Sequence, residues 1–165
     1  MSLDPTPRLA VHRSGHGPDL VLFHGGMGSW KHWIRNVGPL GERFTVHALD
    51  HPSYGDSASV PRETTGPQYL DLVHALLLEA FPGAAPLRFA GFSFGAAIAS
   101  SMARRLGPRV SHLALISPGG FPTRNERGFG PELIFPGEHQ HIDVLHAPRA
   151  DPHLDLPRAG RRRIG

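Results

Sequence analysis

One stretch of the sequence has the residue types and spacing of a reactive serine. Residues 89–97 read Phe-Ala-Gly-Phe-Ser-Phe-Gly-Ala-Ala, an apolar segment that runs into Gly-x-Ser-x-Gly and then into small residues of helical type. This pattern is typical of a tight strand-to-helix turn that exposes a nucleophile, here Ser93. Gly91 and Gly95 flank the serine because a Cβ at either position would crowd the turn. A turn of small residues without chemistry is the alternative, and the pattern alone does not decide between the two.

A second candidate element is the glycine loop that follows the apolar residues 19–23. Acyl transfer needs hydrogen-bond donors aimed at a carbonyl oxygen as it becomes an oxyanion, and fixed backbone N–H groups serve well. The expected pair is the N–H of Phe94 with an N–H of Gly25 or Gly26, and Gly26 is preferred. His24 comes too early in the chain for the usual base, so we expect it to shape this loop.

The elements that must position these residues alternate between strands and helices. Such alternation predicts an α/β fold with a mostly parallel sheet covered by helices on both faces. Chemistry then lies beyond the carboxyl ends of the strands. His24, Asp50 and Ser93 each end a strand, so we expect them on one rim. The predicted strands span 8–12, 19–24, 44–50, 87–92 and 110–116, and the predicted helices span 30–41, 67–80 and 94–106.

Nucleotide binding is a rival interpretation of the same glycine loop. A Gly-x-Gly-x-x-Gly turn binds dinucleotide phosphates, and Asp50 stands near the position of a ribose-binding acid. In that alignment Gly26 and Gly28 would be the first two glycines, but Lys31 occupies the place of the third. The third glycine supports close packing of helix on strand, which a lysine prevents. The rival also leaves Ser93 unexplained, so it stays as the lesser alternative.

Composition and charge indicate which kinds of molecule this protein binds. The 165 residues carry a net charge of +3 and no cysteine, so we expect neither disulfides nor thiol chemistry. The arginines are scattered apart from 161–163, so no nucleic-acid-binding face is expected. The sequence contains no apolar run of about 18 residues, so no membrane span is predicted. With no leader pattern at the first residues, we expect a cytoplasmic protein that acts on a small molecule.

Three segments together resemble the α/β-hydrolase superfamily. They are residues 24–30, 50–57 and 91–95, and their order and spacing match over roughly residues 8–125. The resemblance is greatest to bacterial single-domain hydrolases that include carbon–carbon bond hydrolases of ring-cleavage products, and esterases. One departure is Ser53, where the family usually has glycine, so the shape of that loop is expected to differ slightly.

The resemblance implies a mechanism and a substrate class. Ser93 would attack a carbonyl carbon, a histidine would take its proton, an acid would orient that histidine, and water would clear the acyl-enzyme. The family order is Ser, then Asp or Glu, then His. The expected substrate is a small ester or the carbon–carbon bond of a ketone-like compound, with no cofactor and no metal.

The acid and the base are not evident in the sequence. Only 72 residues (165 − 93) follow Ser93, so we expect residues 1–127 to be the N-terminal portion of a hydrolase core. Residues 128–165 are rich in proline, histidine and arginine and are expected to be an irregular, disordered tail, with 144–146 its one possible strand. A truncated or frame-shifted C-terminus is the hypothesis, and a catalytically dead fragment is an alternative function. Three pairs of a histidine base and an aspartate acid remain open, namely His141 with Asp143, His146 with Asp151, and His153 with Asp155.

Overall fold

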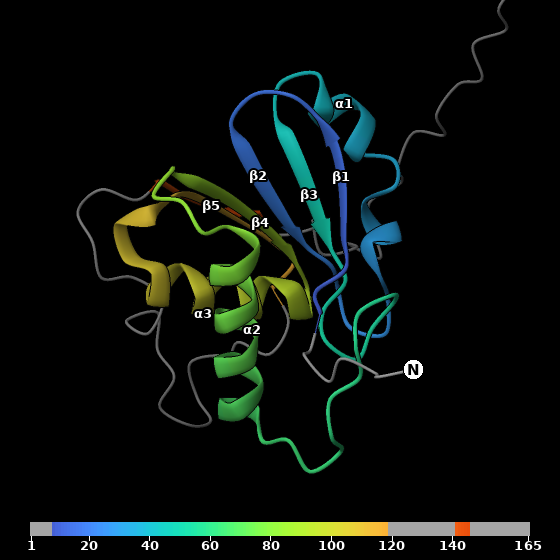
Figure 1. The fold of residues 1–165 in the computed structure, drawn as a ribbon. Coiled ribbons are helices and arrows are strands. Elements are labelled where there is room, and N and C mark those ends of the chain that lie inside the picture. Colours follow the sequence, from blue (N-terminus) through green and yellow to red (C-terminus); the bar gives the residue numbers. More distant parts are fainter. Residues whose placement is uncertain (1–7, 119–140, 146–165) are drawn as a thin grey trace, which may run out of the picture.

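The computed structural model describes residues 8–118 and 141–145. Within these residues a six-stranded sheet has the order β1-β3-β2-β4-β5-β6 (Figure 1). β1 pairs antiparallel with β3, and all other pairs are parallel, as the alternation of elements predicted. The strands are β1 (Val11–Gly15), β2 (Asp19–Phe23), β3 (Thr45–Leu49), β4 (Leu87–Phe92), β5 (Val110–Ile116) and β6 (His141–Leu145).

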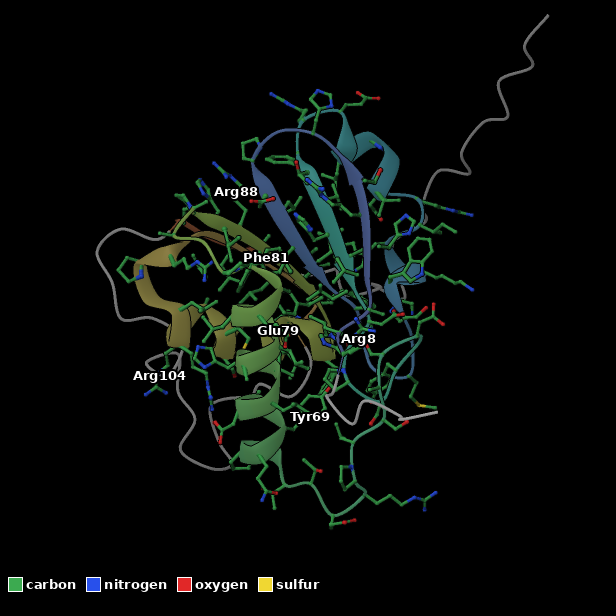
Figure 2. All side chains as sticks on the ribbon, viewed as in Figure 1. Arg8, Tyr69, Glu79, Phe81, Arg88 and Arg104 are labelled. Carbon is green, nitrogen blue, oxygen red and sulfur yellow. The ribbon has the colours of Figure 1, made fainter. Side chains whose placement is uncertain are left out.

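Helices α2 (Gly66–Ala80) and α3 (Phe94–Leu106) cover one face of the sheet (Figure 1). Thr65 and Gln68 form a capping box at the start of α2, a device worth about 1 kcal/mol. The small residues near the start of α3, among them Ala96 and Ala99, are fully buried, which lets the helix approach the strands closely. The larger residues buried with them include Phe81, which follows α2 (Figure 2).

The other face carries two short elements, where a single helix was predicted. η1 (Trp30–Trp33) is a 3₁₀ turn capped by the Ser29 hydroxyl, and α1 (Val37–Gly41) follows it separately. A 3₁₀ turn has three residues per turn, so Trp30 and Trp33 share a side and the next residue points elsewhere. Ile34 is therefore 57% exposed, where a single helix over 30–41 would have turned it towards the sheet with Trp30 and Trp33.

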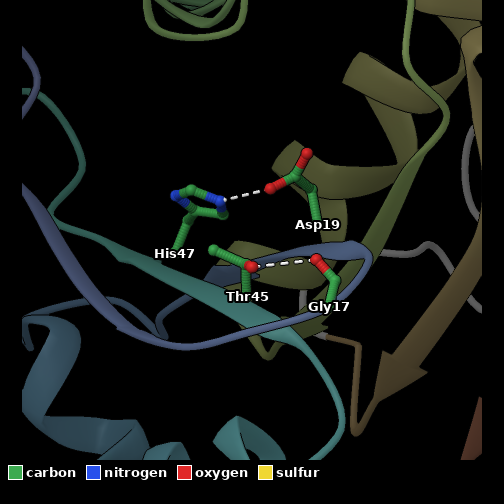
Figure 3. Close-up of polar contacts among 4 residues, drawn as sticks. All are labelled: Gly17, Asp19, Thr45 and His47. Carbon is green, nitrogen blue, oxygen red and sulfur yellow. Dashed lines mark hydrogen bonds and ion pairs between the residues drawn. The ribbon is translucent and has the colours of Figure 1, made fainter.

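The amino ends of β2 and β3 are joined by polar contacts (Figure 3). The His47 Nε2 lies 2.7 Å from Asp19 Oδ1, and the Thr45 hydroxyl donates to the Gly17 carbonyl at 2.8 Å. These contacts lie at the end of the sheet opposite to Ser93. They give His47 a structural role in joining the two strands.

Two strand predictions need correction. The first strand was expected at 8–12 but lies at Val11–Gly15, where it pairs residue by residue with β3. Residues 128–165 were expected to be irregular, with 144–146 as the one possible strand, and residues 141–145 form β6 beside β5. Residues 141–144 alternate polar and apolar side chains over a stretch too short to stand out, and backbone pairing with the edge of β5 stabilises the strand. The rest of the predicted tail lies outside the described residues.

Candidate active site

Three neighbouring strands deliver the candidate residues to one rim of the sheet. Asp50, His24 and Ser93 directly follow β3, β2 and β4, which are adjacent in that order. The prediction that they share a rim is therefore confirmed. The carboxyl ends of parallel strands are where α/β sheets place their chemistry.

Ser93 has a backbone conformation that non-glycine residues rarely adopt. Its φ is 53° and its ψ is −116°, between the end of β4 and the start of α3. Its N–H donates to the Ile116 carbonyl at 3.0 Å, and its own carbonyl accepts from Ala96 N–H at 3.0 Å. Strained residues of this kind persist where the surroundings hold them, and they cluster at functional sites. The side chain is half-buried, so a small reactant can reach it.

The two flanking glycines are required by close backbone contacts. A Cβ on Gly91 would lie 2.5 Å from the Gly95 carbonyl oxygen. A Cβ on Gly95 would overlap the carbonyl oxygens of Phe23 and His24 at the end of β2. The first turn of α3 therefore sits directly on the end of β2, next to the glycine loop.

Gly26 and Phe94, the predicted pair of amide donors, lie side by side. A Cβ built on Gly26 would be 3.6 Å from the Phe94 Cβ. Gly26 is exposed, and within the described residues its N–H has no hydrogen-bond acceptor. Phe94 is the first residue of α3, so its N–H has no acceptor within the helix. Two unpaired amides are thus available beside Ser93.

Aromatic rings surround the Phe94 side chain. Tyr54 and Tyr69 each place their ring centroid 6.4 Å from that of Phe94, and His51 lies at 5.9 Å. The Tyr69 hydroxyl donates to the Pro52 carbonyl at 3.1 Å, and burial raises the pKa of Tyr69. The surroundings of Phe94 are therefore largely aromatic, and the Tyr69 hydroxyl among them is already hydrogen-bonded.

Asp50 is a buried carboxylate that ties two loops together. It is 2% exposed and accepts from Trp30 N–H at 2.6 Å and from Asp56 N–H at 2.9 Å. Its carbonyl accepts from the Ser57 hydroxyl at 2.6 Å. A Cβ on Gly55 would overlap this carboxylate, which explains a glycine there. The role of Asp50 in this geometry is to join η1 to the loop after β3.

The loop after β3 also accounts for the departure at Ser53. Ser53 has φ +69°, in the left-handed region that favours glycine. Its hydroxyl oxygen accepts from Val60 N–H at 2.9 Å, which anchors the loop locally. The chain therefore keeps the backbone shape that glycine would allow and adds a hydrogen bond.

Histidines hold the glycine loop, as His24 was expected to do. His24 is fully buried, and its Nδ1–H donates to the Gly25 carbonyl at 2.6 Å. The His51 N–H donates to His24 Nε2 at 3.0 Å, and the His51 Nε2–H donates to the His24 carbonyl at 3.1 Å. Burial lowers the pKa of His24 and lowers that of His51 to about 3. Both rings are therefore neutral at physiological pH.

His32, His51 and the two tyrosines near Phe94 were missed by sequence reasoning. The Gly25 N–H donates to His32 Nδ1 at 3.2 Å, and the His32 ring occupies the space beside Gly28. No periodicity or motif indicates such contacts, because they join separate loops. Within residues 8–118, no hydrogen bond joins a histidine to the Ser93 hydroxyl.

The position of β6 bears on the open acid and base pairs. Leu145 pairs with Ile116 at the carboxyl end of β5, so the carboxyl end of β6 lies on the Ser93 rim. His141 pairs with His112, four residues earlier, which places its backbone about 13 Å from that rim. This placement argues against the pair of His141 and Asp143. The other two pairs lie outside the described residues.

Residues 18–137, more than half of the chain, match the family described as alpha/beta hydrolase fold. The chain therefore belongs to the α/β-hydrolase family. It is similar to the pimeloyl-[acyl-carrier protein] methyl ester esterase of Chromobacterium violaceum, with 35% identity over 118 residues, 72% of this chain and 44% of that protein. It is 32% identical over 107 residues to a human (lyso)-N-acylphosphatidylethanolamine lipase, covering 64% of this chain and 31% of that protein.

Solved structures agree with this assignment. A membrane phospholipase A described as a bacterial virulence factor has a TM-score of 0.62 and 33% identity, over 72% of this chain and 38% of that one. Cfl2 from Burkholderia cenocepacia has a TM-score of 0.62 and 28% identity, over 76% and 43% of the two chains. The chain thus spans less than half the length of the relatives it matches.

Residues 8–118 and 141–145 contain neither a membrane-spanning helix nor a cluster of metal-binding side chains. No helix there is both long and apolar enough to cross a membrane. No group of three or more acidic or histidine side chains there is arranged to hold a metal ion. The histidines around the glycine loop are engaged in hydrogen bonds instead.

Proposed function

We propose that this chain carries the nucleophile and the oxyanion hole of a serine hydrolase. The observation that carries the proposal is the strained turn of Ser93, with the unpaired amides of Gly26 and Phe94 beside it. A turn that served only to join a strand to a helix would have no need of a serine at φ 53°. Glycine would adopt that conformation at lower cost.

The oxyanion hole is proposed to consist of the N–H groups of Gly26 and Phe94. Gly25 was the alternative donor, but its N–H already donates to His32. The amides need no reorganisation as the oxyanion forms, which is why such donors are worth about 10²–10³ in rate. The start of α3 adds the positive end of a helix dipole next to the developing charge.

The substrate class that fits best is a carboxylic ester. Attack by the Ser93 hydroxyl oxygen forms a tetrahedral intermediate, the alcohol leaves with a proton from the base, and water hydrolyses the acyl-enzyme. Relatives that are named as a methyl ester esterase and as a lipase support an oxygen ester over a carbon–carbon bond. The reaction proceeds through protein groups alone, without a cofactor.

The acid and the base, where this chain supplies them, are proposed to follow β6. The candidates within this chain are His146, Asp151, His153 and Asp155, which all follow β6. The order of Asp151 before His153 agrees with the family order of acid before histidine. A chain without a working pair would be a non-catalytic hydrolase fragment, which is the second candidate function.

Nucleotide binding is disfavoured by two contacts. The Asp50 carboxylate is buried and already accepts two backbone N–H groups, so it cannot reach a ribose. The His32 ring fills the space beside Gly28 that a phosphate would need.

Covalent labelling tests the proposal. A fluorophosphonate probe should label the wild-type chain at Ser93, as peptide mass spectrometry would locate it, and should fail on Ser93→Ala. Ser101→Ala, which removes a half-buried serine from α3, is the matched control and should label like the wild type. Absence of labelling in the folded wild-type chain would favour the non-catalytic fragment.

A further inference from the structure

Three imidazole rings surround the two consecutive peptide groups that join His24 to Gly25 and Gly25 to Gly26. One peptide group consists of the His24 carbonyl and the Gly25 N–H, and the next consists of the Gly25 carbonyl and the Gly26 N–H. Both groups are of interest because the proposed function makes Gly26 N–H an oxyanion donor, so the inference rests on that proposal.

The second peptide group is oriented by the side chain of His24. Its Nδ1–H donates to the Gly25 carbonyl at 2.6 Å. The described residues contain no cis peptide bond, so the Gly26 N–H points away from that carbonyl across the same plane. The ring therefore lies at the carbonyl edge of this peptide group, and the Gly26 N–H is left free at the opposite edge.

The first peptide group is held at both ends. The His24 carbonyl accepts from His51 Nε2–H at 3.1 Å, and the Gly25 N–H donates to His32 Nδ1 at 3.2 Å. Rotation of this group would turn Gly25 and with it the following peptide. His51 is buried, whereas His32 comes from the exposed side of η1.

His32 is itself held in place by its neighbours. Its ring packs against Gly28, where a Cβ would overlap it, and meets the Phe92 ring edge-on at a centroid distance of 5.8 Å. A Cβ on Gly25 would also come within 2.9 Å of the Phe92 ring. The Phe92 ring thus lies against both the His32 ring and the Gly25 backbone, and Gly28 borders the His32 ring.

We propose that His32 is a positioning residue that fixes the oxyanion amide of Gly26 by accepting the Gly25 N–H at Nδ1. The ring does not touch the reacting atoms. Its effect reaches Gly26 through the two rigid peptide planes, and the His24 ring holds the second plane from the other side.

The position of the acceptor atom allows a sharp test. An asparagine Oδ1 lies where the histidine Nδ1 lies, whereas a glutamine places its polar atoms near the position of Nε2. We expect fluorophosphonate labelling of Ser93 to be about tenfold slower in His32→Ala and His32→Gln, and to recover most of its rate in His32→Asn. His16→Ala is the control, because His16 is exposed at the opposite end of the sheet.

Amide NMR gives a readout that does not depend on catalysis. The Gly26 resonance should move in the Ala and Gln variants and return towards the wild-type position in Asn. Equal labelling rates with an unmoved Gly26 resonance in His32→Ala would overturn the inference. If the wild-type chain is not labelled, the proposed function fails, and the NMR series alone decides whether His32 holds the loop.

Discussion

Acidification should destabilise this protein through the buried ring of His51. The side chain is 1% exposed, and burial lowers the pKa of His51 to about 3. The neutral ring donates its one N–H to the His24 carbonyl, while the neighbouring His24 ring opposes any positive charge. In the unfolded chain a histidine has a pKa of about 6.5.

The difference between the folded and the unfolded pKa of His51 fixes the direction and the size of the change in stability. Because the pKa of the folded state is the lower one, the unfolded chain binds the proton first, and stability is lost as the pH falls from about 6.5 towards about 3. Each pH unit in this range costs about 1.4 kcal/mol, so pH 5 should lower the free energy of unfolding by about 2 kcal/mol through His51 alone. Burial lowers the pKa of His24 too, which adds to the loss.

Urea denaturation at pH 7, 6 and 5 measures the effect. His51→Gln keeps a donor near the position of Nε2 but does not titrate. Below about pH 6 the free energy of unfolding of this variant should therefore fall less steeply than that of the wild type, with a difference that approaches about 1.4 kcal/mol per pH unit. His16→Gln removes an exposed histidine and should retain the wild-type slope. Equal slopes in the wild type and in His51→Gln would refute a neutral, buried His51.

Two further substitutions test the site geometry through stability. Ser93→Gly should raise the free energy of unfolding by about 1 kcal/mol, because glycine adopts φ 53° without strain. The same substitution should abolish labelling. A lower stability of this variant in urea denaturation would contradict a strained turn. Asp50→Ala should cost about 2–5 kcal/mol, because the N–H groups of Trp30 and Asp56 lose their buried acceptor. The exposed neighbour provides the control, since Asp56→Ala should change stability by less than about 0.5 kcal/mol. A small effect of Asp50→Ala would mean that water satisfies both amides.

The parts of the fold that the sequence predicted well have strong local patterns. β4 and β5 begin and end where their apolar runs do, and α3 follows Ser93 directly. Turn glycines and proline mark the ends of these elements. Because β3, β2 and β4 are parallel, the three marked ends lie on one rim. The single helix over 30–41 failed because tertiary contacts of the tryptophans favour a 3₁₀ turn there.

The sequence by itself determined the order of strands and helices, the strand-to-helix turn at Ser93 and the family of the chain. The order of elements and the turn follow from hydrophobic period and from the backbone freedom of glycine, which are local properties, and the family was indicated by the resemblance of residues 24–30, 50–57 and 91–95 to its members. Only the tertiary structure decided that β6 completes the described sheet, that Asp50 is enclosed, and that the rings of His24, His51 and His32 converge on Gly25. Hydrogen bonds between loops depend on distances that no local pattern contains, since those loops meet only after the strands have paired.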